Sequence, residues 1–181
     1  MVVGGGPAGS SAAFAAAKNG IKVALIEKEN SIAETVRTSG VTWIESINEF
    51  GIPDNCYNPI KNFSFVSPNN EVTIKDSIAT AAVLDVRKTY RWLAHESEVA
   101  GADIFIKINI NEVIKNENND IIGVIGTGPN GKIIFHSKIV IDATGFTSTI
   151  SKAMGFVTQW KRFGAGAEYE AEVENADPDT W

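Results

Sequence analysis

The chain has 181 residues, which is enough for one domain with a substantial core, or for one domain and part of a second. Hydrophobic residues make up 44% and charged residues 21%, as in ordinary globular proteins, and a net charge of −6 without a Lys/Arg cluster argues against nucleic acid as a partner. No run approaches the roughly 18 apolar residues of a transmembrane helix, so we expect any membrane contact to be peripheral.

The first 29 residues have the pattern of a strand, a helix and a second strand. Two valines form the end of the first strand. An Ala-rich helix is expected over residues 7–19, because proline is tolerated in a first helical turn and the glycine that follows is a natural stop. The apolar run at 21–29 predicts a strand buried on both faces. These elements form a βαβ unit.

The turn between the first strand and the helix, residues 4–9, reads GGGPAG and matches the pattern G-x-G-x-x-G. In such a turn Gly4 allows the tight bend, Gly6 lets a pyrophosphate approach the backbone, and Gly9 lets helix and strand pack closely. Glu27 ends the second strand, where a carboxylate accepts hydrogen bonds from ribose and repels the 2′-phosphate of NADP. A glycine-rich turn of an unrelated α/β protein is the alternative, but the whole context favours a dinucleotide.

The next fifty residues depart from simple β/α alternation. A short helix is expected near 44–50, followed by a break at Gly51-Ile52-Pro53, and two strand-like runs on either side of residues 68–70 predict a β-hairpin. The single cysteine, Cys56, excludes an intrachain disulfide and fits a reducing, cytoplasmic setting. The two histidines stand apart from other potential ligands, so we expect no metal site.

Helical periodicity returns at residues 85–102, where a stripe of apolar and small side chains repeats in steps of four and three. The stripe consists of Val86, Tyr90, Leu93, Ser97 and Ala100. Asp85 is the expected N-cap of this helix and Gly101 its expected stop. Arg87 and Arg91 lie off the stripe.

Three strands separated by turn sequences follow, at 103–115, 120–128 and 131–138, and they predict a β-meander. Residues 138–145, KIVIDATG, then predict another buried strand, followed by a helical stretch over 148–154. The last segment, from residue 163, is expected to begin as a strand. The hairpin and the meander favour FAD over NAD, because in FAD-type proteins distant pieces of chain complete the βαβ unit.

Four segments, GGGPAGSSAA, VRTSGV, LDVRKTYRWL and IDATGFTS, occur in an order and spacing that resembles the FAD-dependent oxidoreductases of the glutathione-reductase fold. Within that group of aromatic hydroxylases and geranylgeranyl reductases, VRTSGVTW and GAGAEYEAEV are most similar to archaeal-type geranylgeranyl reductases. The resemblance covers almost the whole chain. It implies an α/β, FAD/NAD(P)-binding Rossmann-like three-layer fold with a central parallel sheet, a β-meander and part of a β-rich substrate domain.

The resemblance also implies a set of FAD-binding residues. The pyrophosphate would lie against the glycine turn, the adenosine ribose against Glu27 with Lys28 beside it, and the adenine under Val113. The loop at 37–40 would pass the flavin, Arg87 would reach toward the FAD chain, and the strand that ends in Gly145 would approach the cofactor. In chain order, the implied residues are Gly4, Gly6, Ala8, Gly9, Glu27, Lys28, Arg37, Thr38, Ser39, Gly40, Arg87, Val113 and Gly145.

Two of these positions have another interpretation, and a third departs from the family pattern. Arg37 and Arg87 could be solvated or ion-paired rather than bound to FAD, although a fixed guanidinium suits a pyrophosphate. Some reductases of the family carry Cys where Thr38 aligns, so a role that depends on a thiol is not implied. Asp142 is expected to cap the turn after its strand rather than to act in catalysis, and no catalytic residue is assigned.

The function implied by the resemblance is hydride transfer from reduced flavin to an isoprenoid C=C bond of a geranylgeranyl lipid. The substrate would be an isoprenoid or another small molecule, and NAD(P)H or ferredoxin the reductant. An FAD-dependent monooxygenase of the aromatic hydroxylase type is the alternative enzyme. An inactive, truncated fragment that at most binds FAD is the alternative from a different class.

The implied domain arrangement divides the FAD-binding part. Residues 1–42 would be its first piece, 43–80 a hairpin insertion of the substrate domain, 81–158 its second piece, and 159–181 the start of a truncated substrate domain. Members of the family have a later Gly-Asp motif that contacts the ribityl chain, and the sequence stops before it. We therefore expect the chain to be a fragment that, alone, retains little or no flavin.

Overall fold

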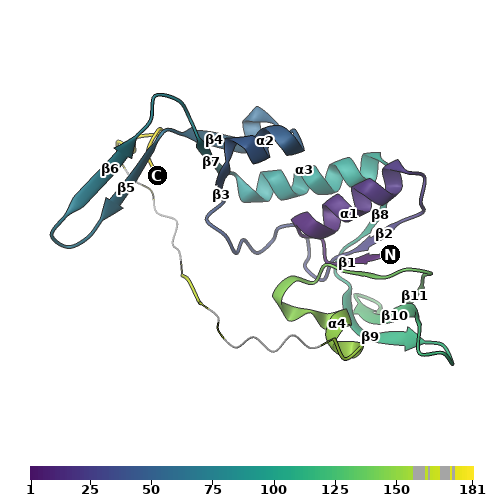
Figure 1. Cartoon of the computed structure of the whole chain (residues 1–181). Helices are drawn as coiled ribbons and strands as arrows, with labels where there is room; N and C mark the ends of the chain where they lie inside the picture. Colours follow the sequence, from purple (N-terminus) through teal and green to yellow (C-terminus); the bar gives the residue numbers. More distant parts are fainter. Residues whose placement is uncertain (157–161, 163, 168–171, 173) are drawn as a thin grey trace. The chain divides into compact units, whose positions relative to one another are not determined.

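The computed structural model describes residues 1–156, 162, 164–167, 172 and 174–181 of the chain. The chain divides into two compact units (Figure 1). The first unit consists of Met1–Thr35 and Tyr90–Lys161, and the second of Val36–Thr89 and Arg162–Trp181. Among the described residues, no helix is long and apolar enough to cross a lipid bilayer.

A four-stranded parallel sheet is the centre of the first unit. Its strands are β1 (Val2–Val3), β2 (Ala24–Ile26), β8 (Asp103–Phe105) and β12 (Ile141–Asp142), in the spatial order β12-β1-β2-β8. β1 is therefore a central strand with β2 on one side and β12 on the other. Numbered along the chain, the order is 4-1-2-3, which is the order of the first four strands in a classic Rossmann sheet.

Two further layers cover this sheet. Helix α1 (Pro7–Lys18) packs on one face through Ala13 and Ala17. An antiparallel meander packs on the other face, and it is formed by β9 (Asn109–Lys115), β10 (Ile121–Gly128) and β11 (Gly131–His136). The expected three-layer α/β fold with a parallel sheet and a β-meander is thus confirmed.

Side chains alternate between the two faces along each parallel strand, so this short sheet contributes to two hydrophobic cores. Val2 and Leu25 face the α1 layer, whereas the next residues, Val3 and Ile26, face the meander. All four are at most 4% exposed. A β-strand that is buried on both faces needs apolar residues at every position, so the consecutive apolar residues of β1 and β2 reflect the three layers.

The prediction of a single strand over residues 103–115 is wrong, because the structure divides this segment between two sheets. β8 joins the parallel sheet, and the chain then crosses to the meander layer before β9 begins. Lys107 has a left-handed backbone (φ +60°) at this crossing, and its N–H donates to the carbonyl of Glu29. The apolar pattern continues through the crossing because Ile108 is buried in the meander core, so the sequence gives no sign of a break.

A short helical segment follows the parallel sheet at its last strand. A 3-10 turn, η2 (Gly145–Thr147), leads into α4 (Thr149–Ala153). Ile150 of α4 is buried in the meander-side core. The helix expected over 148–154 is therefore confirmed to within one residue at each end.

The second unit is mainly β-structure. A three-stranded antiparallel sheet has the order β3 (Val41–Trp43), β7 (Ala81–Leu84), β4 (Tyr57–Ile60), and β5 (Asn62–Val66) pairs with β6 (Glu71–Lys75) as the expected hairpin. Helix α2 (Ile44–Phe50) is the expected short helix, and Gly51, which follows it, has a left-handed conformation. A 3-10 turn, η1 (Asp54–Cys56), precedes β4.

The sheet of β3, β7 and β4 was not predicted from the sequence. Its strands are three or four residues long, and β4 contains Pro59, which favours an edge position and weakens a strand pattern. The strand expected from residue 163 onward lies largely outside the described residues.

Helix α3 (Val86–Val99) has the two ends that the sequence predicted. The Asp85 carboxylate accepts a hydrogen bond from the Lys88 N–H at 3.0 Å, which makes Asp85 the N-cap. Gly101 follows the helix with φ +107°. Ser97 is buried as the stripe predicts, and Thr89 and Ala94 are buried although the stripe omits them.

Candidate dinucleotide site

The candidate site lies where three parallel strands end at the same edge of the sheet. Gly4 follows β1, Glu27 follows β2 and Ala143 follows β12. The chain leaves β1 toward β2, while β12 flanks β1 on the opposite side, so the strand order reverses at β1. In open α/β sheets, ligands bind in the crevice at this kind of switch point.

Gly4 and Gly9 are glycines because backbone passes too close for a side chain. Gly4 has φ +106°, and its N–H donates to the carbonyl of Ile26 at 2.8 Å. A Cβ on Gly4 would collide with the carbonyl of Ala143, and a Cβ on Gly9 would collide with the carbonyl oxygen of Gly4. The two glycines therefore let α1 rest directly against the ends of β1 and β12.

Gly6 is a glycine for the opposite reason. It is the N-cap of α1, with Pro7 as the first helical residue, and a Cβ built on it would meet nothing within 4 Å. Ala8 is exposed in the same turn, and the first turn of α1 carries no acidic side chain. Open space therefore lies beside Gly6 at the positive end of the helix dipole. This arrangement fits a pyrophosphate, which is negatively charged.

Glu27 contacts the glycine turn directly. Its Oε2 accepts a hydrogen bond from the Gly5 N–H at 2.7 Å, and its Oε1 accepts one from the Glu29 N–H at 2.9 Å. Each carboxylate oxygen can accept more than one hydrogen bond, so acceptor capacity remains for a hydroxyl group. Lys28, the neighbour of Glu27, is exposed.

Two other predicted residues of the first unit lie on the meander side. Val113 is half-buried in β9, where it pairs with Val124 of β10 and packs against the meander core. The sequence led us to expect a strand that ends in Gly145, and this expectation is wrong. β12 ends three residues earlier at Asp142, and Gly145 begins η2 with φ +65° and with open space where a Cβ would lie.

Asp142 explains why the strand ends early. Its Oδ1 accepts hydrogen bonds from the N–H and the hydroxyl of Thr144 at 3.1 and 2.6 Å, and its Oδ2 accepts from the N–H and the hydroxyl of Ser151 at 2.8 and 2.7 Å. Partial burial alone would raise the pKa of Asp142, but these four hydrogen bonds outweigh it and lower the pKa below 3.8. The expected capping role is confirmed.

The remaining predicted residues belong to the second unit. Arg37, Thr38 and Ser39 are exposed, and the Thr38 hydroxyl accepts a hydrogen bond from the Gly40 N–H at 3.2 Å. Gly40 is buried with φ +79°, and a Cβ there would come within 2.9 Å of Leu84 and Val86 atoms. Arg87 is exposed in the first turn of α3. Gly40 thus lies against the segment that leads into α3, and Arg87 follows Val86 in that segment.

Sequence reasoning missed two side chains that hold the candidate site together. Ser10 is fully buried, and its hydroxyl donates to the carbonyl of Gly5 at 3.2 Å. The Arg91 Nε donates to the carbonyl of Ile32 at 3.2 Å, in the segment that follows β2. Only Ser10 could have been noticed in the sequence, because it is a polar residue that directly follows the third glycine in a helix rich in alanine.

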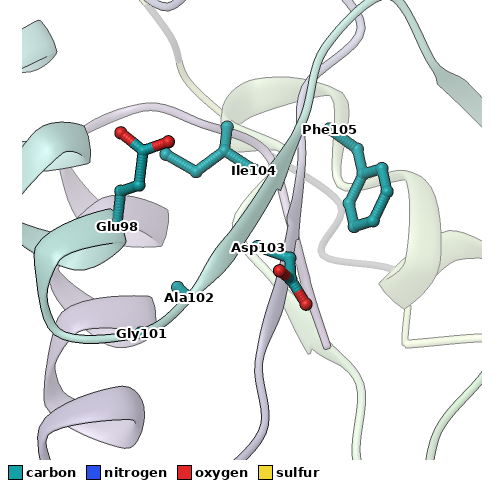
Figure 2. A pocket seen from close by; sticks show the side chains of 6 residues that line it. All are labelled: Glu98, Gly101, Ala102, Asp103, Ile104 and Phe105. Carbon is teal, nitrogen blue, oxygen red and sulfur yellow. The ribbon is translucent and has the colours of Figure 1, made fainter.

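A separate shallow hollow runs along the edge strand β8 (Figure 2). Figure 2 shows Ile104 and Phe105 on opposite sides of this strand, in keeping with the alternation of the two cores. The charged groups of the hollow, Glu98 and Asp103, are both acidic and so repel phosphate. The hollow contains none of the predicted FAD-binding residues. Within the described part of the chain, no cluster of His, Cys, Asp or Glu could hold a metal ion.

Comparison with known proteins agrees with this geometry. The model of the family described as FAD dependent oxidoreductase matches residues 1–162. The chain is 34% identical to a digeranylgeranylglycerophospholipid reductase of Methanocaldococcus jannaschii, over 98% of this chain and 45% of the reductase. It is 32% identical to an uncharacterized protein of Methanosarcina barkeri, over 86% of each chain. The chain thus spans less than half the length of the reductase.

Solved structures share the fold. A geranylgeranyl bacteriochlorophyll reductase-like protein of Thermoplasma acidophilum superposes with a TM-score of 0.71 at 32% identity, over 81% of this chain and 38% of that one. A p-nitrophenol 4-monooxygenase of Pseudomonas putida superposes with the same TM-score at 19% identity, over 85% of this chain and 42% of that one, which shows the fold alone. The resemblance seen in the sequence is confirmed, and the chain belongs to the FAD dependent oxidoreductase family.

Proposed function

We propose that this chain supplies the ADP-binding half of the FAD site in an enzyme that reduces isoprenoid C=C bonds of geranylgeranyl lipids. The observation that carries the FAD site is the open space at Gly6, beside a helix N-terminus without acidic side chains. The relatives named as digeranylgeranylglycerophospholipid reductases, at about one third identity, support the lipid substrate.

In this proposal the residues of the first unit bind the nucleotide end of FAD. The pyrophosphate lies against the turn of Gly4, Gly6, Ala8 and Gly9, where backbone N–H groups donate to its oxygens. Glu27 accepts from the ribose hydroxyls while it keeps its bond to Gly5, since each carboxylate oxygen has two lone pairs. The remaining members of this group, with proposed roles at the ribose, the adenine and the end of β12, are Lys28, Val113 and Gly145.

The residues of the second unit are proposed to serve the flavin side. The loop of Arg37, Thr38, Ser39 and Gly40 passes the flavin, and Arg87 provides a cation for the FAD chain. Buried Gly40, held by the Leu84 N–H through its carbonyl at 3.0 Å, anchors this otherwise exposed loop. We retain the proposed division into FAD-binding pieces at 1–42 and 81–158, a hairpin insertion at 43–80 and a substrate-domain start at 159–181.

When bound, reduced flavin would supply a hydride for one alkene carbon while a proton is added to the other carbon, and the protein would bind, orient and shield the cofactor. NAD(P)H or ferredoxin is the proposed reductant, and peripheral contact with a membrane would give access to a lipid substrate. The proposed roles of the chain's own residues are all in binding, and none of them is assigned a catalytic role.

Binding is tested first, by titrating the 181-residue chain with FAD, FMN and ADP under the same conditions. Because the proposed contacts are made to the ADP half, FAD and ADP should bind competitively and FMN, which lacks that half, should not bind. Equal binding of FMN and FAD, or no binding of ADP at millimolar concentration, would contradict the proposal.

The reaction is tested on the enzyme that contains this half of the FAD site. The assay supplies a geranylgeranyl lipid and chemically reduced FAD under anaerobic conditions. We expect loss of alkene groups measured by mass spectrometry. Consumption of O₂ with NAD(P)H and hydroxylation of an aromatic compound would instead identify a monooxygenase, whose fold this chain shares.

A further inference from the structure

We propose that Ser10 is a positioning residue for the phosphate-binding turn, because its hydroxyl holds the Gly5–Gly6 peptide in the orientation that presents the Gly6 N–H to the ligand. This inference rests on the proposed FAD site and deepens it. Two consecutive peptide units of the turn are held by buried or half-buried side chains.

The first peptide unit, between Gly4 and Gly5, is held by Glu27. The Gly5 N–H donates to the Glu27 carboxylate at 2.7 Å. In a trans peptide the C=O points opposite to the N–H, so the Gly4 carbonyl is directed away from Glu27. That carbonyl lies where a Cβ on Gly9 would collide with it, which places it against the start of α1.

The second peptide unit, between Gly5 and Gly6, is held by Ser10. The Ser10 hydroxyl donates to the Gly5 carbonyl at 3.2 Å, while the Ser10 N–H donates to the Gly6 carbonyl at 2.9 Å. The Gly5 carbonyl is thereby turned inward, toward a side chain that is fully buried. By the same trans geometry, the N–H of Gly6 is turned away from Ser10 and out of the core.

The outward N–H is available to a ligand. Among the described residues, the Gly6 N–H has no hydrogen-bond acceptor, and a Cβ on Gly6 would meet nothing within 4 Å. An N–H that is already oriented binds an anionic oxygen without a cost for ordering the turn. Without the Ser10 hydroxyl, the Gly5–Gly6 peptide between two flexible glycines would lose the side-chain hydrogen bond that fixes its carbonyl.

A purely structural role explains Ser10 less well. Ser10 lies in the Ala-rich helix α1, where alanine has the higher helix propensity and buries no polar group. Its hydroxyl therefore needs a partner, and that partner is the carbonyl of the turn rather than a group of the helix body.

The test compares Ser10→Ala with Ser11→Ala in the full 181-residue chain. Ser11 is the neighbouring, half-buried serine of the same helix, so its variant controls for the loss of a helical hydroxyl that does not hold the Gly5 carbonyl. Affinities for ADP and for adenosine are measured by NMR titration into the millimolar range, and thermal unfolding is followed by circular dichroism.

We expect Ser10→Ala to weaken ADP binding about fivefold to tenfold, as for loss of one oriented hydrogen bond to a charged oxygen. Adenosine binding should change less than about twofold in the same variant, because adenosine has no phosphate to contact Gly6. Ser11→Ala should leave both affinities unchanged.

Two outcomes would overturn the inference alone. These are ADP binding by Ser10→Ala equal to that of the wild type, and an equal loss for ADP and adenosine, which would show general damage to the site. Failure of the wild-type chain to bind ADP at all would overturn the proposed FAD site together with the inference.

Discussion

The three glycines of one short turn are needed for different physical reasons. Gly4 and Gly9 stand where another backbone atom occupies the place of a side chain, so they are required by the fold. Gly6 has open space in the same direction, so nothing in the fold requires a glycine there. In the proposed site, a ligand that approaches the backbone is the remaining requirement, so Gly6 is proposed as a binding glycine, whereas Gly4 and Gly9 are packing glycines.

Alanine substitution should distinguish these roles. We expect Gly9→Ala to lower the free energy of unfolding by about 1–3 kcal/mol or more, because the added methyl group collides with the Gly4 carbonyl. Gly6→Ala, with φ −71°, should cost less than about 1 kcal/mol but weaken FAD binding about tenfold or more. Urea unfolding and FAD titration measure the two effects. Similar losses of stability in both variants would contradict the distinction.

Asp142 is a second residue whose role depends on geometry rather than on its charge alone. Its carboxylate joins the end of β12 to α4 through the backbone and hydroxyl groups of Thr144 and Ser151. Because these bonds lower the folded-state pKa below 3.8, the ionised form stabilises the fold. That stability is fully present above the unfolded pKa and is lost as the pH falls through the folded pKa, so the sensitive window lies below about pH 4.

We therefore expect Asp142→Asn to lower the free energy of unfolding at pH 7 by about 1–3 kcal/mol, toward the lower end because the carboxylate is only partly buried. The difference from the wild type should shrink as the pH is lowered from about 4 to 2. Denaturant unfolding across this range measures it, with the exposed Asp103→Asn as the control. A difference that is independent of pH would show that the charge has no role.

At the scale of elements, the meander is more than a cover over the sheet. β10 is its central strand, and Val124 of β10 is fully buried in a core shared with Val3 and Ile26 of the parallel sheet. β11 is an edge strand of the same meander, and its Ile134 is 50% exposed. Ile133 and Phe135, the neighbours of Ile134 in β11, pack against that core, so Ile134 lies on the opposite face of the meander, because side chains alternate along a strand.

Truncation of these two side chains should show the difference. We expect Val124→Ala to lower the free energy of unfolding by about 1.5–3 kcal/mol, because it removes buried methyl groups and leaves a cavity. Ile134→Ala removes more atoms from a half-exposed site and should cost less than about 1 kcal/mol. Equal costs, measured by urea unfolding, would mean that the meander does not share a core with the sheet.

For the whole molecule, local patterns were enough to predict most elements. The βαβ unit, the helix over 44–50, the β5–β6 hairpin and the ends of α3 were all predicted, because each depends on residues that are neighbours in the chain. The part of the candidate site that is formed by residues close together in the sequence could also be recognised from the sequence. Gly4, Gly6 and Gly9 lie within six residues, and Glu27 follows at the end of the next strand.

What could not be predicted depends on distant segments. The strand expected over 103–115 was divided between two layers, since Phe105 and Ile108 are equally apolar and both are suited to a core. The short sheet of β3, β7 and β4 is formed by strands that are tens of residues apart. The end of β12 was misplaced by three residues, because it is set by Asp142 bonding to Ser151.

The sequence by itself determined that a dinucleotide turn of the FAD type is present, because its glycines, its helix and its acidic strand end are local features. Only the tertiary structure decided which glycine is free for a ligand and which residues hold the turn. The Ala143 carbonyl explains Gly4, and the buried Ser10 hydroxyl and the Glu27 carboxylate orient two successive peptides of the turn. The physical reason is that a steric clash or a hydrogen bond depends on where atoms meet in space, and an amino-acid pattern states only which residues are available.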